Sequence, residues 1–254
     1  MSGKSSREAR REERLQVESA GKQEERRKRL LQIGSAAVFL AVVIVAVLIV
    51  VNQSESDGGD TSLENVATVR GELRGIPQKG MALGDPSAKV TLAEFGDLQC
   101  PVCKGFAEEV IPEVIDSKVR SGEAKIEFRS FTIINEESVP AAAAAIAAGK
   151  QGRGWNFVEL FYRNQGIEAS GYVTDEFLTE VARGAGVPNI AQWNKDRKST
   201  SVRDQVQTET DEAETLGLSG TPSFVITGPN TGGKEVLGTP GSAEGLEEAI
   251  EAAS

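Results

Sequence analysis

The sequence predicts an α/β domain with an inserted group of helices, preceded by a single N-terminal transmembrane helix. Two observations lead to this prediction. Strand and helix patterns succeed one another from residue 89 to residue 252, and an uncharged apolar run separates them from a charged N-terminal segment. The 254 residues suffice for one soluble domain and an anchor. With 39% hydrophobic and 26% charged residues, the composition is ordinary for a globular protein.

The N-terminal part of the chain is interpreted as a cytoplasmic tail, residues 1–29, and a transmembrane anchor, residues 30–52. The tail carries ten Lys and Arg against six Glu; a solvated segment is the simplest interpretation, and contact with lipid headgroups is the alternative. About 20 apolar residues cross the ~30 Å hydrocarbon core. A secretory signal has a shorter apolar region, roughly 7–15 residues, followed by a small-residue cleavage site. The basic residues Arg26–Arg29 favour a cytoplasmic N-terminus.

The charge and composition of the remaining chain exclude several functions. It carries 18 Lys and Arg against 32 Asp and Glu, so we expect no nucleic-acid partner, because nucleic-acid affinity depends on neutralising phosphates. The whole chain has no histidine and two cysteines, which rules out Ser–His–Asp triads, Cys–His dyads and His-based metal sites. A tetrahedral zinc site needs about four N or S ligands. We therefore expect neither a metal nor a bound cofactor.

The first elements of the domain follow a predicted linker, residues 53–72, which begins with the polar stretch SESDGGDTS. We expect the folded domain to cover residues 73–254. Its first strand is Lys89–Phe95, rich in β-branched and apolar residues and preceded by the turn signal GDP. A helical pattern follows to about residue 120, and Pro112 is expected to kink or break it. The next predicted strand is Lys125–Ile134.

The later elements begin with an Ala-rich stretch, residues 140–160, which predicts a helix because Ala has the highest helix propensity. The remaining predicted elements are helices at 175–185 and 192–216, strands at 223–227 and 234–237, and a final helix at 243–252. We take about 136–216 as a helical insertion. The resulting order of elements is that of a thioredoxin-like fold with an α-helical domain inserted between its two halves.

Cys100 and Cys103 lie where the first strand passes into a helix. A cysteine near the unpaired N–H groups of a helix start experiences a dipole that favours negative charge. Its thiol pKa should fall below that of free cysteine, about 8.5. Pro101 suits the first helical turn, where its missing N–H costs nothing. We expect exchange through a mixed disulfide in which Cys100 reacts and Cys103 resolves. The alternatives are a structural disulfide, whose loop is too small to stabilise much, and a metal site shared between two chains.

Two further residues are candidates for the same site. Glu94 lies six residues before Cys100 in an apolar strand, where a carboxylate is costly to bury. It is interpreted as a proton acceptor for the Cys103 thiol, directly or through water; the alternative is an outward-facing strand residue. Pro222 precedes the strand at 223–227, and its pattern alone predicts a trans peptide bond, since only about 5–6% of X–Pro bonds are cis.

The segment EFGDLQCPVC, residues 94–103, together with GTP at residues 220–222, resembles the DsbA-like family of thioredoxin-fold proteins. The resemblance covers about residues 73–252 and is strengthened by four residues of the helical stretch, namely Trp155, Phe157, Phe161 and Gly166. It implies the following catalytic residues: Cys100 as nucleophile, Cys103 as resolving thiol, Glu94 as buried acid and a cis Pro222. It also implies that substrate is bound by Thr221, Pro101 and Val102.

The resemblance further implies an enzyme of the cytoplasmic membrane. Its catalytic domain faces outward, its substrates are exported polypeptides, and a quinone-linked membrane protein often reoxidises it. Strongly oxidising members carry His where this chain has Val102, which offers the thiolate no stabilisation and should lower the potential. The expected function is disulfide formation or exchange. The alternatives are a reductase or isomerase, and a non-catalytic binding or chaperone module. The intact cysteine pair argues against the binding module. A peroxidase is a weaker alternative, because nothing in the sequence marks a peroxide-binding Arg beside the nucleophile.

Overall fold

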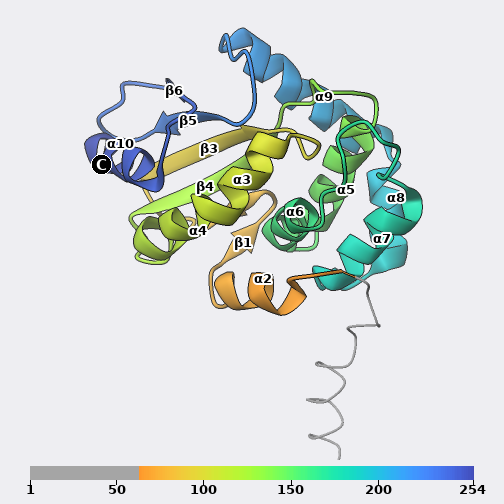
Figure 1. Cartoon of the computed structure of the whole chain (residues 1–254). Coiled ribbons are helices and arrows are strands. Elements are labelled where there is room, and N and C mark those ends of the chain that lie inside the picture. Colours follow the sequence, from red (N-terminus) through yellow and green to blue (C-terminus); the bar gives the residue numbers. More distant parts are fainter. Residues whose placement is uncertain (1–62) are drawn as a thin grey trace, which may run out of the picture. The chain divides into compact units, whose positions relative to one another are not determined.

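The computed structural model of the chain describes residues 63–254. The predicted cytoplasmic tail and the predicted anchor, residues 30–52, lie outside the described residues. Within residues 63–254, no helix has both the length and the apolar character needed to cross a membrane. This part of the chain folds around a six-stranded sheet in the order β1-β2-β4-β3-β5-β6, with helices packed on both of its faces (Figure 1).

The sheet has a parallel centre and antiparallel edges. Its strands are β1 (Gln78–Lys79), β2 (Ala82–Leu83), β3 (Val90–Gly96), β4 (Ala124–Ser130), β5 (Ser223–Thr227) and β6 (Glu235–Gly238). β3 and β4 run parallel, whereas β5 pairs antiparallel with β3 on its other side. The four predicted strands are therefore present. The β1–β2 hairpin was not predicted, because strands of two residues are too short to show an alternating pattern.

The second predicted strand, 125–134, is too long at its C-terminal end. β4 ends at Ser130. Beyond it, the N–H groups of Ile133 and Ile134 donate to the carboxylate of Asp97 instead of to a neighbouring strand. The break predicted at Pro112 is confirmed. Helix α3 (Pro101–Glu109) ends before Pro112, and the chain continues as α4 (Ile111–Val114) and a π-helical turn, η1 (Ile115–Val119).

The helical insertion contains five helices between the halves of the sheet. These are α5 (Ser138–Gly149), α6 (Gly154–Arg163), α7 (Asp175–Gly184), α8 (Ile190–Arg197) and α9 (Thr200–Thr215). Two of its predicted helices, 140–160 and 192–216, are each divided in two. The first divides at Gly152, whose φ of +69° ends α5, and the N–H of Arg153 donates to the carbonyl of Ala148 there. On either side of this turn, Gly149 and Gly154 pack against the main chain of Gly80, where a Cβ atom would come within 2.8 Å and 2.7 Å of its carbonyl oxygen. The second divides at Ser199, whose side chain caps α9 by accepting from Val202 N–H.

The predicted linker, residues 53–72, is wrong in its last part, because helix α2 (Val66–Glu72) belongs to the folded domain. Val69 is buried, and its neighbours at helical spacing, Val66 and Leu73, join the same core. The Arg70 guanidinium donates to the carbonyl of Gly184 at the end of α7. The domain therefore begins before residue 73. It ends with α10 (Ala243–Ala253), close to its predicted bounds.

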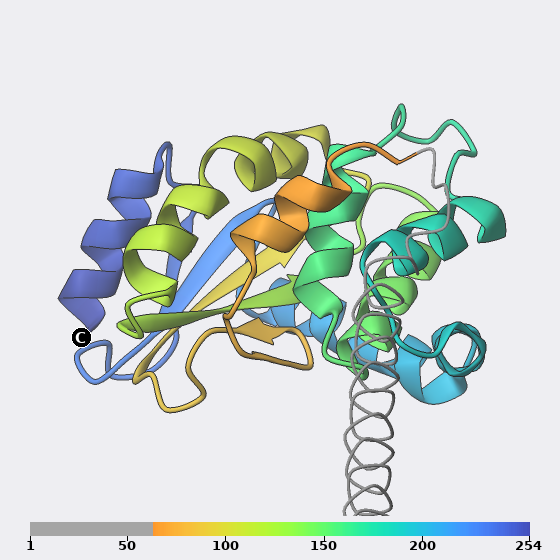
Figure 2. The ribbon, with the colours of Figure 1, turned by 90° about the horizontal axis from the view of Figure 1, so that it is seen from below.

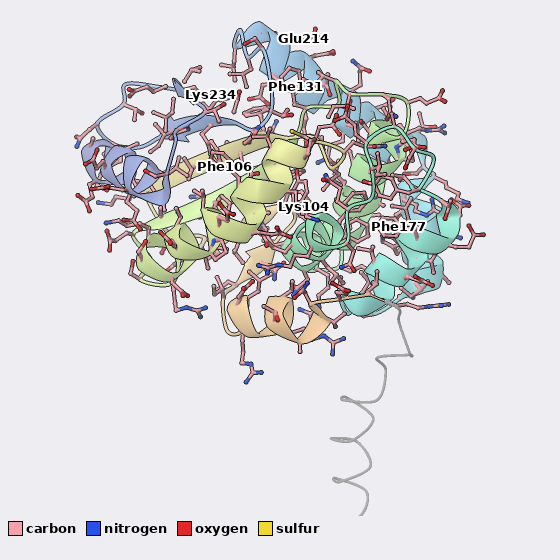
Figure 3. The ribbon with its side chains drawn as sticks, viewed as in Figure 1. Lys104, Phe106, Phe131, Phe177, Glu214 and Lys234 are labelled. Carbon is pink, nitrogen blue, oxygen red and sulfur yellow. The ribbon has the colours of Figure 1, made fainter. Side chains whose placement is uncertain are left out.

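Two apolar layers hold the helices to the sheet. α3, α4 and α10 lie together on one side of the strands (Figure 2). On the other side α9 packs against a smaller core, whose buried members are Phe95, Phe131, Ala213, Leu218 and Val225. Aromatic pairs link the larger core. The ring centroid of Phe106 on α3 lies 5.7 Å from that of Phe224 on β5, and that of Phe161 on α6 lies 5.2 Å from that of Phe177 on α7. Figure 3 labels Phe106 and Phe177 on their helices. α6 thus packs between α3 and the outer helices of the insertion.

Candidate active site

The cysteine pair occupies the junction between β3 and α3 (Pro101–Glu109). Cys100 is the N-cap residue of α3, and its Sγ accepts the N–H of Cys103 at 3.4 Å. Pro101 occupies the first helical turn, as predicted. Both cysteines are free thiols, and their exposed fractions are 5% for Cys100 and 0% for Cys103. The spacing of three residues therefore places both sulfurs on one helical turn, with the first at the helix start.

The two sulfurs differ in acidity. A hydrogen bond from the Cys103 side chain is the main cause that lowers the pKa of Cys100 to about 6. Hydrogen bonds from the side chain of Thr221 and from the main chain at Val102 and Cys103 lower it further, against the opposing effect of burial. Cys100 is therefore mostly a thiolate at neutral pH, which agrees with the acidity expected at a helix start.

Cys103 behaves in the opposite way. Burial raises its pKa well above the ordinary value, and its hydrogen bond to Cys100 and the charges of Cys100 and Glu94 raise it further. The pair thus combines a thiolate at the helix start with a buried, protonated thiol one turn later. This arrangement can attack a disulfide through Cys100 and hold a proton on Cys103.

Glu94 lies on β3 with 1% of its surface exposed, so the outward-facing alternative is wrong. Its partners across the sheet are Phe128 on β4 and Phe224 on β5. One carboxyl oxygen, Oε1, has no hydrogen-bond partner among the described residues. Burial, followed by the negative charge of Cys100, raises the pKa of Glu94 to about 8. A carboxyl group in this setting can be protonated at neutral pH.

The segment before β5 lies against the first sulfur. Cys100 Sγ is 3.3 Å from the main-chain oxygen of Thr221. The Thr221–Pro222 peptide bond is cis, as the resemblance implied and contrary to the trans form expected from the local pattern. Hydrogen bonds hold both sides of this segment, from Ser223 Oγ to Gly220 O at 2.7 Å and from Thr239 Oγ1 to Pro222 O at 2.6 Å. All four predicted catalytic residues are therefore brought to one place.

The two predicted substrate-binding residues of the CPVC turn lie at the surface. Val102 is 54% exposed, and Pro101 is also exposed. Such an exposed apolar side chain beside the reactive sulfur is available to a polypeptide that approaches Cys100.

The sequence reasoning missed Asp97, which fixes the loop between β3 and α3. Its buried carboxylate accepts three main-chain N–H groups, from Gln99 at 2.9 Å, Ile133 at 3.0 Å and Ile134 at 3.1 Å. Its main-chain oxygen accepts the N–H of Cys100. An Asp that bonds the N–H two residues later forms an Asx turn, and an acid between Gly96 and Leu98 was the only sequence signal for it.

Residues of the helical insertion complete the support of the loop. Gln165 Nε2, after α6, donates to the carbonyls of Leu98 at 2.7 Å and Cys100 at 3.1 Å. The hydroxyl of Tyr162, on α6, donates to the main-chain oxygen of Asp97. No local pattern marks these two residues, because their contacts cross more than 60 positions of the chain.

A thioredoxin-like fold with this cysteine pair defines a thiol–disulfide oxidoreductase, and comparison with known proteins agrees. A family model described as Thioredoxin matches residues 77–252, more than half of the chain. The chain is 30% identical to the probable disulfide bond formation protein D of Bacillus anthracis, over 58% of this chain and 69% of that protein. It is 29% identical to the protein of the same description from Bacillus cereus, over the same shares of each chain.

The solved structure of oxidised BdbD from Bacillus subtilis shares the fold, with a TM-score of 0.60 and 22% identity over 69% of this chain and 96% of that one. The chain therefore belongs to the thioredoxin family, within its DsbA-like thiol–disulfide oxidoreductases.

Proposed function

We propose that the protein forms or exchanges disulfides in exported polypeptides, through Cys100 and Cys103, on the outer side of the cytoplasmic membrane. The observation that carries this proposal is the contrast between the two sulfurs, with Cys100 ionised at the helix start and Cys103 buried and protonated. The apolar run at residues 30–52 supports a membrane anchor, with the N-terminus in the cytoplasm. The curated relatives are named as disulfide bond formation proteins, which supports the direction of the reaction.

The proposed reaction transfers two electrons from a substrate dithiol to the oxidised pair. A substrate thiolate attacks Cys100 Sγ, the Cys100–Cys103 bond breaks, and Cys103 leaves as a thiolate. Glu94 then donates a proton to Cys103, because burial, the largest cause that raises its pKa, favours its protonated form. The second substrate thiolate attacks the substrate sulfur of the mixed disulfide and releases Cys100 as a thiolate, its favoured form.

In disulfide exchange, the protein starts with a reduced cysteine pair and attacks a substrate disulfide, and the same groups act in the reverse order. Cys100 attacks a substrate disulfide, and Cys103 must lose its proton to resolve the mixed disulfide. The charge of Cys100 is one cause of the raised pKa of Glu94. Because that charge disappears in the mixed disulfide, Glu94 ionises more readily at the step at which Cys103 needs a proton acceptor.

Substrate recognition is proposed to involve the main chain of Thr221 together with Pro101 and Val102. A strand of substrate can lie along the segment before β5, where the Thr221 carbonyl faces the sulfur. A second exposed apolar residue, Ile133, follows β4, and its main-chain N–H donates to Asp97 in the loop before α3. An apolar surface of this kind favours unfolded polypeptides, and reoxidation by a quinone-linked membrane protein is part of the same proposal.

Trapping of mixed disulfides tests this function. In Cys103→Ser, the thiolate of Cys100 can still attack, but no second sulfur releases the substrate, so we expect exported proteins to be cross-linked to Cys100. Cys100→Ser is the matched control and should trap nothing. The measurement is recovery of reducible adducts after acid quenching. If neither variant is cross-linked to any exported protein, the binding module becomes the better interpretation.

The direction of net electron flow is tested by the reduction potential of the pair. The side chain of Val102 offers the thiolate no polar stabilisation, so we propose a potential below that of the strongest oxidants of the fold, about −120 mV. A value near that of thioredoxin, about −270 mV, would instead support the reductase.

A further inference from the structure

A second buried carboxyl group lies beyond Glu94. Glu159, on α6, has 1% of its surface exposed, and neither of its carboxyl oxygens has a hydrogen-bond partner among the described residues. The positive group beside it is Arg163, one turn later on the same helix, with Nη2 at 3.6 Å from Glu159 Oε2. An ionisable group kept inside a protein with so little compensation is costly, and such groups often have a functional role.

The fold brings Glu159 to the same side of the sheet as Glu94. Glu94 is the cross-strand partner of Phe128, and the Phe128 ring meets the edge of Tyr162 with a centroid distance of 6.4 Å. Tyr162 lies three residues after Glu159, on the same face of α6. The two carboxyl groups also interact electrostatically: the charge of Glu94 is one of the causes that raise the pKa of Glu159.

The charged and titratable groups that act on the two carboxyls come from α2, from α6 and from the start of α3. They are Glu72 on α2, Tyr162 and Arg163 on α6, and Cys100 and Cys103 at the start of α3. Burial is the largest cause that raises the pKa of Glu159 to about 8, and the Arg163 guanidinium opposes it. The pKa values of Glu159 and Glu94 are therefore similar, both about 8.

Arg163 connects Glu159 to the surface. Its Nη2 donates to Glu72 Oε2 at 2.7 Å, and the Glu72 side chain is 30% exposed. Ion pairs thus join Glu159 through Arg163 to solvent at Glu72, and Glu159 in turn interacts electrostatically with Glu94 beside the sulfurs. Because Glu94 is buried, it needs such a connection to recover a proton that it has given to Cys103.

We propose that Glu159 is a proton relay of the redox centre, which passes protons between Glu94 and the solvent beside Glu72 and Arg163. The proposal rests on the proposed exchange through Cys100 and Cys103. When Cys103 leaves as a thiolate, Glu94 gives it a proton and becomes a carboxylate. Glu159 then gives its proton to Glu94, is stabilised as a carboxylate by Arg163, and takes a proton from water. The reverse sequence releases the proton when Cys103 resolves a mixed disulfide. Glu159 touches no reacting atom and acts through Glu94.

The first test compares Glu159→Gln with the wild type in reduction of the oxidised protein by dithiothreitol, which needs no protein substrate. We expect the wild-type rate to change over the pH range in which the two carboxyls titrate, up to about 8, because the oxidised pair lacks the Cys100 charge that helps to raise the pKa of Glu94. In Glu159→Gln this step should be roughly tenfold slower and lose part of its solvent deuterium isotope effect. Glu209→Gln, a buried carboxyl on α9 that bonds Ser130 N–H, is the matched control and should keep the wild-type profile.

The second test measures the protonation of the carboxyl groups directly, by infrared difference spectroscopy between the reduced and the oxidised protein. We expect both Glu94 and Glu159 to contribute protonated-carboxyl bands. In Glu94→Gln the pKa of Glu159 should fall, because a cause that raises it is removed. This arm keeps the proposal testable if Glu159→Gln fails to fold.

Two results separate the proposals. A wild-type pH profile and isotope effect in folded Glu159→Gln would show that Glu159 is only an ion-pair partner of Arg163, and the relay would be wrong. Failure of Cys103→Ser to trap exported proteins, with the dithiothreitol and infrared results as expected, would instead overturn the proposed function and leave the relay intact.

Discussion

The junction of β3 and α3 and the helical insertion contribute differently to the same site. The junction, residues 94–103, carries both sulfurs and Glu94, and its chemistry arises from contacts between near neighbours in the sequence, such as Cys103 N–H to Cys100 Sγ. The insertion, residues 138–215, supplies no sulfur, but its side chains reach back to the loop, as Gln165 does at Leu98 and Cys100. The comparison suggests that reactivity is set locally, whereas position is set by distant parts of the chain.

The largest expected effect concerns the local part of this comparison. With a pKa of about 6, Cys100 is mostly ionised at pH 7, whereas the raised pKa of Cys103 leaves it protonated. We expect iodoacetamide to alkylate Cys100 at least about 100-fold faster than Cys103, with a midpoint near pH 6, because the thiolate is the reactive form. Mass spectrometry of peptides from the reduced protein measures both rates. Equal rates, or a midpoint near that of free cysteine, would contradict the local origin of the acidity.

The next effect concerns the cost of burying Glu94. Its pKa is raised from 4.5 in the unfolded chain to about 8 in the folded one, so the folded state binds the proton more tightly. The stabilisation from this group is therefore complete below pH 4.5 and is lost as the pH rises through 8. Glu94→Gln should remove this pH dependence and raise the free energy of unfolding at pH 8 by on the order of 3 kcal/mol.

Urea unfolding at several pH values measures this difference. The variant and the wild type should converge at low pH, where Glu94 is protonated in both states. Glu176→Gln, an exposed acid on α7, is the control and should change the free energy of unfolding little at any pH. A wild type that is more stable than Glu94→Gln at pH 8 would mean that a partner compensates the buried charge.

Much of the junction could be predicted from the sequence, because its signals are local. The cysteine spacing, the Pro101 position and the acid in an apolar strand each act within a few residues, and the helix start follows from them. The cis bond at Pro222 is different. Only about 5–6% of X–Pro bonds are cis, so its pattern predicted the trans form, and only the resemblance gave the cis form.

The insertion was predicted as helical, but its divisions and its contacts were not. The break between α5 and α6 falls at Gly152, whose φ of +69° ends the first helix. The glycines on either side of it, Gly149 and Gly154, approach Gly80, which lies far away in the sequence. Glu159 was not among the predicted site residues, because its burial arises only in the folded domain. Asp97 was missed for the same reason, since two of its three hydrogen bonds go to residues after β4. Tertiary approach of this kind leaves no periodic pattern.

The smallest expected effect tests the distant part of the comparison. Gln165→Ala removes the hydrogen bonds to the carbonyls of Leu98 and Cys100, and we expect it to lower the free energy of unfolding by about 1–2 kcal/mol. Gln151→Ala is the matched control, since Gln151 also makes two hydrogen bonds, both to the main chain of Asn189. If the insertion positions the loop, both variants lose similar stability, but only Gln165→Ala changes the alkylation rate of Cys100, by a few-fold. A pKa of Cys100 that moved far from 6 in Gln165→Ala would break the comparison, because the insertion would then set reactivity as well as position.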